Sequence, residues 1–385
     1  MQKGEVMSKI KMAYSKHTTE KIAVQELSDQ LSDMNCKYVL FFTSSCYDPA
    51  KLSHSFNNIF PMATVFGCSG AGELVSGYML QDSIVAMGIS DDVFEDLYIE
   101  ILNLRKFNSK LMRDSIHNFK EYYSVPLNQM DRNKYFGIVL ADGLSIETER
   151  VLDELGEYSN LSFIGGSAGS TMNMQPVVFA NRTYYYNTVL IALIKSKLKI
   201  GFEIIQNIEF FNDEKHTSFI ATEVDEDNRI IYKLDDKPAL EAFAEALDIT
   251  PEEVFDASKK HPLCSYIENM QFIKSISSIV AKGGLKCYST TKKGTKLYIT
   301  NTFDILEHTR NYVNDLPEKY ENNILGMVIF NCFERFMLLQ TDKDREEYGN
   351  IFEKIPTIGC DTFGESFIGF NNLSATVLVI EDKEI

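Results

Sequence analysis

Short apolar runs separated by polar segments recur along the chain, and this pattern predicts buried strands alternating with helices. The runs are rich in β-branched and aromatic residues, and Gly, Ser, Asp or Pro bounds them, which is typical of strands inside a sheet. They occupy residues 38–42, 83–89, 135–140, 188–194, 325–330 and 375–380. Each is far shorter than the roughly 20 residues that a helix needs to cross a bilayer, so no membrane span is expected.

One order of elements occurs three times along the chain. A strand comes first, then a stretch with helical potential, then a glycine-rich turn and a second strand, which indicates one repeated supersecondary unit. The helical stretches are expected at residues 49–59, 145–158 and 342–354, and the turns at residues 61–73, 161–171 and 355–365. Residues 304–314 and 317–319 are expected to form a polar connection to the third copy.

The segment between the second and third copies has a different pattern, which indicates antiparallel strands. Strands are expected at residues 203–209, 229–234, 278–282, 285–289 and 296–300, and a helix at residues 238–247. Pro238 suits the first turn of that helix. We therefore predict an α/β fold (α+β in the middle segment), with mixed sheets flanked by helices and built from repeated strand-helix-Gly turn-strand units. The expected domains are an N-terminal extension at residues 1–34 and two modules at residues 35–205 and 206–385.

Charge and cysteine content limit the expected partners. The 385-residue chain carries 38 basic and 55 acidic residues, a net charge of -17. Nucleic-acid binding without sequence preference needs Lys and Arg to replace phosphate counterions, so neither a nucleic acid nor an anionic membrane is an expected partner. Seven scattered cysteines without a CxxC pair indicate reduced thiols. The polar N-terminus lacks the apolar segment of a signal peptide, and a cytoplasmic location is expected.

The glycine-rich turns carry the most distinctive chemistry. The first reads Gly-Cys-Ser-Gly-Ala-Gly-Glu at residues 67–73, and the third keeps Gly359-Cys360 and Gly364-Glu365. The second has Gly165, Gly166 and Ser167 but no acid at the matching place. Glycine lets a ligand approach the backbone closely, and successive N–H groups can form an anion-binding concavity. The alternative is that these glycines only permit tight strand crossings; the spacing does not fit a nucleotide-binding loop.

These motifs resemble the FIST domains, a pair of N-terminal and C-terminal modules found in signalling proteins. The resemblance covers nearly the whole chain, and it also rests on Asp142-Gly143, Pro238-Ala239-Leu240-Glu241, His261-Pro262-Leu263, and Cys332 with Arg335. It implies a sensory protein for a small ligand such as an amino acid. It also implies a separate signalling partner, such as a histidine kinase or a cyclase. Some members of the family are described as haem-binding nitric-oxide sensors.

The expected ligand site combines one basic residue with several acids. Arg335 is the candidate for an anionic group because a guanidinium binds two oxygens at once, with a structural ion pair as the alternative. Glu73, Glu365 and Asp142 would hold an ammonium group. The full expected set is Gly67, Cys68, Ser69, Glu73, Asp142, Gly165, Gly166, Ser167, Arg335, Cys360, Asp361 and Glu365. We expect the C-terminal copy to pack back toward the N-terminal copies, around a shared cleft.

Two other functions stay open at this stage. A haem sensor needs an axial ligand, for which His261 is the candidate, although a packing or capping role is the commoner one for such a residue. No cofactor is otherwise expected, and no two histidines have the spacing of a zinc site. An enzyme with a cysteine nucleophile would use Cys68 or Cys360, but it needs a nearby base, and no histidine lies close to either in sequence. No catalytic residue is therefore assigned.

Overall fold

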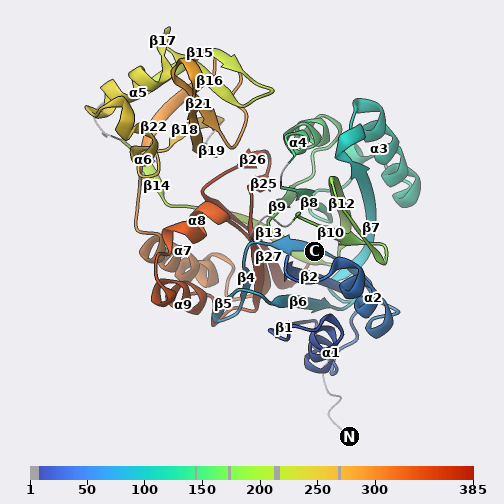
Figure 1. Cartoon of the computed structure of the whole chain (residues 1–385). Coiled ribbons are helices and arrows are strands. Elements are labelled where there is room, and N and C mark those ends of the chain that lie inside the picture. Colours follow the sequence, from blue (N-terminus) through green and yellow to red (C-terminus); the bar gives the residue numbers. More distant parts are fainter. Residues whose placement is uncertain (1–7, 144, 172–174, 212–216, 268–269) are drawn as a thin grey trace, which may run out of the picture. The chain divides into compact units, whose positions relative to one another are not determined.

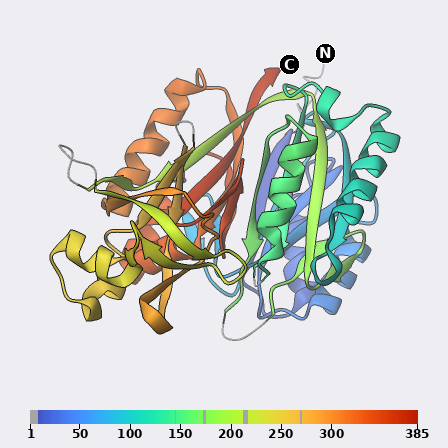
Figure 2. The same cartoon turned by 90° about the horizontal axis from the view of Figure 1, so that it is seen from above.

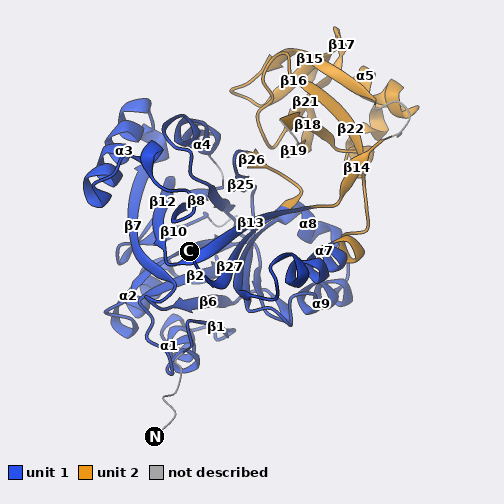
Figure 3. Ribbon diagram, turned by 180° about the vertical axis from the view of Figure 1, so that it is seen from behind, with its two compact units in different colours: residues 1–205, 309–369, 375–385 blue, residues 206–308, 370–374 orange. Residues whose placement is uncertain are grey.

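The computed structural model describes residues 8–143, 145–171, 175–211, 217–267 and 270–385 (Figure 1). They form two compact units (Figure 3). Unit 1 consists of residues 1–205, 309–369 and 375–385, and unit 2 of residues 206–308 and 370–374. The units differ from the expected boundary, which groups residues 206–385, because the strands of the last 60 or so residues pair with N-terminal strands. Among the described residues, no helix combines the length and apolar character that crossing a membrane requires.

Unit 1 contains three mixed sheets in its described part, which confirms the predicted α/β class. The first has the order β1-β6-β2-β3-β10-β11, with β1 (Ile10–Ser15), β2 (Tyr38–Ser44), β3 (Thr64–Gly70), β6 (Ile84–Ile89), β10 (Val178–Ala180) and β11 (Thr183–Tyr185). The second runs β25-β9-β8-β12-β7, with β7 (Phe94–Asn103), β8 (Tyr135–Asp142), β9 (Phe163–Ala168), β12 (Thr188–Ser196) and β25 (Glu365–Phe367). The third runs β13-β27-β23-β24-β4-β5, with β4 (Glu73–Val75), β5 (Tyr78–Leu80), β13 (Leu198–Gln206), β23 (Ile324–Cys332), β24 (Thr357–Thr362) and β27 (Ser374–Glu384).

Each sheet is built around one parallel pair of strands and completed by strands from another part of the chain. The parallel pairs are β2 with β3, β8 with β9, and β23 with β24. The borrowed strands are β10–β11 in the first sheet, β25 in the second and β4–β5 in the third. Because every sheet takes strands from a distant segment, the three sheets cannot form independently of one another.

Helices make the crossovers that parallel strands need. Between β2 and β3 lies α2 (Pro49–Ile59), and Asp48 is its N-cap residue. The Asp48 carboxylate accepts hydrogen bonds from the N–H groups of Ala50 and Lys51. The other crossovers contain α4 (Glu147–Tyr158), and α8 (Phe333–Leu338) followed by α9 (Asp342–Asn350). Two further helices are α1 (Glu20–Gln30) and α3 (Ser109–Tyr123), and α3 lies beside α4 (Figure 2).

One apolar core joins the three sheets of unit 1. The central strands are buried on both faces, as the continuous apolar runs predict. Phe42 of β2 meets Phe330 of β23 edge to face, with ring centroids 5.6 Å apart. Ile138 of β8 and Leu378 of β27 belong to the same buried cluster.

Unit 2 is antiparallel in its described strand pairs, as expected for the middle segment. Its strands are β14 (Ile208–Phe210), β15 (Ser218–Asp225), β16 (Ile230–Leu234), β17 (Lys237–Pro238), β18 (Leu263–Ile267), β19 (Met270–Lys274), β20 (Ile276–Val280), β21 (Gly284–Cys287), β22 (Lys296–Thr302) and β26 (Phe370–Asn371). Its helices are α5 (Ala239–Leu247) and α6 (Val254–Ala257). Phe243 of α5 packs in a core with Leu263, Leu285 and Ile299 of the sheet.

The connection expected at residues 304–314 and 317–319 forms a helix, α7 (Ile305–Lys319), which the sequence pattern did not predict. The Asp304 carboxylate accepts a hydrogen bond from the N–H of Glu307 at 2.8 Å and so caps the helix. Val313 and Leu316 are buried at helical spacing. Pro317 lies inside the last turn of the helix, where its missing N–H removes one helical hydrogen bond. The expected N-terminal extension also contributes to the fold, since β1 pairs with β6 from Ile10 to Ser15.

Candidate functional site

The ends of the parallel strands bring the three glycine-rich segments together in unit 1. The N–H of Ala71 donates to the carbonyl of Asp361 at 2.9 Å, and the N–H of Gly169 donates to the carbonyl of Ser69 at 3.0 Å. The N–H of Phe363 donates to the carbonyl of Ser167 at 2.8 Å. The expectation that the C-terminal copy packs against the N-terminal copies is therefore confirmed. In open α/β sheets, ligands bind beyond the carboxyl ends of such strands.

The glycines expected in turns lie inside strands. Gly67 belongs to β3 and Gly165 to β9, and both strands are paired on two sides. A Cβ atom on Gly67 would lie 1.9 Å from the carbonyl oxygen of Phe41, and one on Gly165 would lie 1.8 Å from that of Val139. A Cβ atom on Gly166 would lie 2.6 Å from Thr362 Cγ2. Close packing of neighbouring strands therefore explains these glycines, the alternative that the sequence left open.

Two buried carboxyl groups form the chemically most unusual feature of this region. Glu73 of β4 is 1% exposed and Asp361 of β24 is 2% exposed. Ser83 Oγ donates to Glu73 Oε2 at 2.7 Å, and Asn331 Nδ2 donates to Asp361 Oδ1 at 2.6 Å. The second oxygen of each group, Glu73 Oε1 and Asp361 Oδ2, has no hydrogen-bond partner among the described residues. Buried polar atoms normally have a partner, so both oxygens have unused capacity to accept a hydrogen bond.

Both carboxyl groups hold their protons more tightly than usual. Burial raises the pKa of Asp361 to about 7, although the Asn331 hydrogen bond and the charges of Arg335 and Arg345 act in the opposite direction. Burial also raises the pKa of Glu73 well above its ordinary value, and the charge of Asp361 adds to this rise. The charge of an ionised Asp361 thus disfavours ionisation of Glu73. A cation close to both groups would relieve that repulsion.

Arg335 holds one member of the pair, Asp361, in place through Asn331. It is fully buried in α8, where its Nε donates to Asn331 Oδ1 at 3.0 Å and its Nη2 donates to Thr309 Oγ1 at 2.8 Å. The hydroxyl of Tyr348 donates to the same Asn331 oxygen at 2.9 Å. Two donors therefore fix the Asn331 amide so that its NH₂ group faces Asp361. These bonds give Arg335 a structural role through the neutral groups of Asn331 and Thr309, and ligand binding by Arg335 stays a prediction.

The other acids of the expected set are bonded to their own surroundings. Asp142 Oδ2 accepts the N–H of Asn187 at 2.8 Å, and Glu365 Oε1 accepts the hydroxyl of Thr362 at 3.0 Å. Ser69 is fully buried, and its Oγ donates to the carbonyl of Gly169 at 2.7 Å. The structure therefore brings the expected acids into one region. Glu73 and Asp361 differ from the others because each has one carboxyl oxygen without a hydrogen-bond partner among the described residues.

The two cysteines of this region are buried together. Cys68 and Cys360 are 0% and 1% exposed. Burial raises the pKa of the Cys360 thiol well above its ordinary value, and its contact with Cys68 raises it further. A nucleophilic cysteine needs a lowered pKa and access to substrate, so these surroundings do not favour the cysteine-enzyme alternative.

The haem candidate lies in the other compact unit. His261 Nδ1 is 2.9 Å from Asn301 Oδ1, and its ring meets that of Phe211 at 5.3 Å. One ring nitrogen is thus engaged with a protein group. Across the part of the chain that the structure describes, no cluster of three or more His, Cys, Asp or Glu side chains could hold a metal ion.

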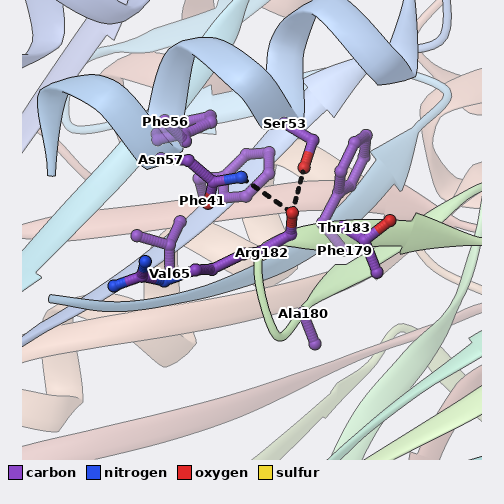
Figure 4. A pocket seen from close by; sticks show the side chains of 9 residues that line it. All are labelled: Phe41, Ser53, Phe56, Asn57, Val65, Phe179, Ala180, Arg182 and Thr183. Carbon is purple, nitrogen blue, oxygen red and sulfur yellow. Dashed lines mark hydrogen bonds between the residues drawn. The ribbon is translucent and has the colours of Figure 1, made fainter. Parts of the chain in front are cut away.

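A small pocket lies between the crossover helix α2 and the strands β2, β3, β10 and β11 (Figure 4). Ser53 Oγ and Asn57 Nδ2 both donate to the carbonyl of Arg182, at 3.1 and 2.7 Å. The volume of about 10 Å³ is close to the minimum that one water needs. These bonds anchor the β10–β11 turn to α2, and the space is too small for a ligand.

Sequence reasoning missed Asn331, Ser83 and Arg345. Asn331 is a polar residue at the end of a buried apolar run, and this was the one signal that could have found it. Ser83 and Arg345 carry no distinguishing pattern.

Comparison with known proteins agrees with the fold. The FIST N domain model matches residues 37–237 and the FIST C domain model matches residues 239–367. An uncharacterized protein of Methanocaldococcus jannaschii is 22% identical over 329 residues, which cover 78% of this chain and 61% of that protein. The chain thus spans about three fifths of the length of this relative. FIST domains are generally associated with sensing in signal transduction. Since the two models cover nearly the whole chain, the protein belongs to the FIST domain family.

Proposed function

We propose that the protein is a small-ligand sensor in intracellular signal transduction, which binds an amino acid or a related molecule through a cationic nitrogen. The observation that carries this proposal is the pair of unpartnered oxygens, Glu73 Oε1 and Asp361 Oδ2, on two buried carboxyl groups. The association of FIST domains with sensing supports it. The signal would pass to a separate protein such as a histidine kinase or a cyclase.

An ammonium group suits these two carboxyls for a physical reason. It carries three donors and no acceptor, so it can bond both unused oxygens and still donate to a third group. Its charge also compensates two carboxyl groups whose pKa values are raised, that of Asp361 by burial and that of Glu73 by burial and the charge of Asp361. A ligand without such a nitrogen would leave both oxygens unpaired, which costs binding free energy. The site would therefore select amines against otherwise similar neutral molecules.

A thermal-shift screen of the amino acids and simple amines tests the proposal. A ligand present at 100 times its Kd stabilises the folded protein by about 2.7 kcal/mol, so at least one compound is expected to raise the unfolding temperature. Glu73→Gln removes the charge but keeps the size, and it should abolish the shift. Glu121→Gln, an exposed acid on α3, is the control that should keep it. A panel without any stabilising compound, or a shift that survives Glu73→Gln, would contradict the proposal.

A further inference from the structure

A second feature of unit 1 is a groove between the β4–β5 hairpin and α9. Its volume of about 470 Å³ lies in the range of small-molecule sites. The β5 strand and its preceding turn form one wall, and the N-terminal half of α9 forms another. The lining residues also come from the segment after β1 and the segment after β5, and the ones used below are Lys16, Tyr78, Asp82, Arg345 and Glu346. None of the residues expected from the sequence to bind a ligand lines this groove.

Arg345 is the group in the groove best prepared to bind a ligand. Its guanidinium lies 4.8 Å from the centre of the Phe336 ring, a contact that restricts its orientation. Its Nη1 donates to Asp342 at 3.2 Å, but Asp342 is fully exposed, so this surface pair is weak. Its Nε is buried and has no hydrogen-bond partner among the described residues. The side chain as a whole is 31% exposed, so other donors of the guanidinium are open to a carboxylate or phosphate, the groups that a guanidinium binds best.

The other walls define what such a ligand would carry. Lys16 adds a second positive charge to the lining of the groove. Tyr78 is 54% exposed, and its ring packs against that of Tyr14 at 5.7 Å, so it offers a supported aromatic surface. Asp82 and Glu346 offer acceptors on the same groove. Since the whole chain has a net charge of -17, a bare anion would be repelled at a distance, whereas a ligand whose amino group offsets the charge of its oxyanion would not.

We infer that this groove binds a small molecule with an oxyanion group, which Arg345 and Lys16 recognise, and with hydroxyl or amino donors that face Asp82 and Glu346. Neither Glu73 nor Asp361 lines this groove, although the charge of Arg345 acts on Asp361. The inference does not depend on the function proposed above. The two sites have a physical connection, because α9 carries both Arg345 and Tyr348, and Tyr348 bonds the Asn331 that holds Asp361. Binding at the groove would therefore act on the element that positions the pair.

The absence of tryptophan from the chain permits a specific test. Tyr78→Trp places a single tryptophan in the groove, and its emission can be followed while inorganic phosphate, acetate or glutamate is added at constant ionic strength. We expect a saturable change with at least one of these probes. Adding Arg345→Gln should weaken binding by about 10-fold or more, the loss of one charge-assisted interaction. Lys343→Gln removes a charge from the same helix outside the groove and should leave binding unchanged.

Two outcomes would overturn the inference. One is the absence of a saturable response to any of the three probes, both in the emission of Tyr78→Trp and in the unfolding temperature of the unmodified protein. The other is an affinity that Arg345→Gln leaves intact. Glu73→Gln in the tryptophan background separates this site from the buried pair: unchanged probe affinity supports two sites, and its loss would contradict them.

Discussion

The Asp361→Asn variant is expected to be more stable than the parent protein at pH 8, with a difference that shrinks as the pH falls toward 5. Burial raises the pKa of Asp361 from 3.8 to about 7. Between pH 3.8 and about pH 7, the folded state therefore keeps a proton on Asp361 that the unfolded state has already released. Stability from this group is fully present below pH 4 and is lost as the pH rises through 7. The loss at pH 8 amounts to roughly 4 kcal/mol as an upper figure.

Asparagine at position 361 removes the free-energy cost of ionising a buried carboxyl group and keeps the local hydrogen bonding. Its amide oxygen can accept from Asn331 Nδ2, as Asp361 Oδ1 does at 2.6 Å. Its amide nitrogen replaces the unpartnered Oδ2 and carries no charge. Some pH dependence should remain, because burial also raises the pKa of Glu73. The same variant should lose any ligand that needs a charge at residue 361.

Denaturant unfolding at pH 5, 6, 7 and 8 measures this effect. Asp91→Asn, an exposed position at the end of the β6 turn, serves as the control and should leave the difference from the parent protein small at every pH. A variant less stable than the parent protein at pH 8 would contradict the interpretation. That result would mean that the ionised Asp361 already has a compensating cation in the folded chain.

Local signals were sufficient to predict most elements of the repeated parts. The α2 helix was predicted with its observed bounds because Asp48 and Pro49 mark its start and its apolar residues have helical spacing. The strands β2, β8 and β23 were found because they are buried on both faces and read as continuous apolar runs. The α7 helix was missed because its exposed face is polar and Pro317 resembles a helix breaker.

The pairings that build the candidate site could not be predicted from local signals. Glu73 pairs with Cys360 across β4 and β24, and Gly166 pairs with Glu365 across β9 and β25. Both pairings join segments far apart in the chain, so they depend on how whole sheets exchange strands. The sequence also identified Arg335 by its chemistry but could not show that Asn331 and Thr309 already occupy its donors. Arg345 shows no such bonding of its Nε, yet nothing in its local sequence distinguishes it.

Gly165→Ala is expected to prevent stable folding of unit 1. The added Cβ atom would lie 1.8 Å from the carbonyl oxygen of Val139 and 3.0 Å or less from its carbonyl carbon and nitrogen. All three are backbone atoms of the neighbouring parallel strand, which cannot shift without disturbing its pairing with β12. We expect a loss of about 3 kcal/mol or more in the free energy of unfolding, seen as a lower unfolding temperature and a lower yield of folded protein.

Gly156→Ala is the matched comparison, because it makes the same chemical change in the helix that connects β8 to β9. Its expected effect on the free energy of unfolding has the opposite sign. Gly156 lies in α4, and a Cβ atom there would meet no other heavy atom within 4 Å. Alanine favours the helix over glycine by about 1 kcal/mol, so this variant should unfold at a slightly higher temperature than the parent protein. If Gly165→Ala were tolerated as well as Gly156→Ala, β8 and β9 could not be as close as the structure places them. The glycine-rich segment would then require another explanation, and direct contact of its backbone with a ligand would regain its place as the first alternative.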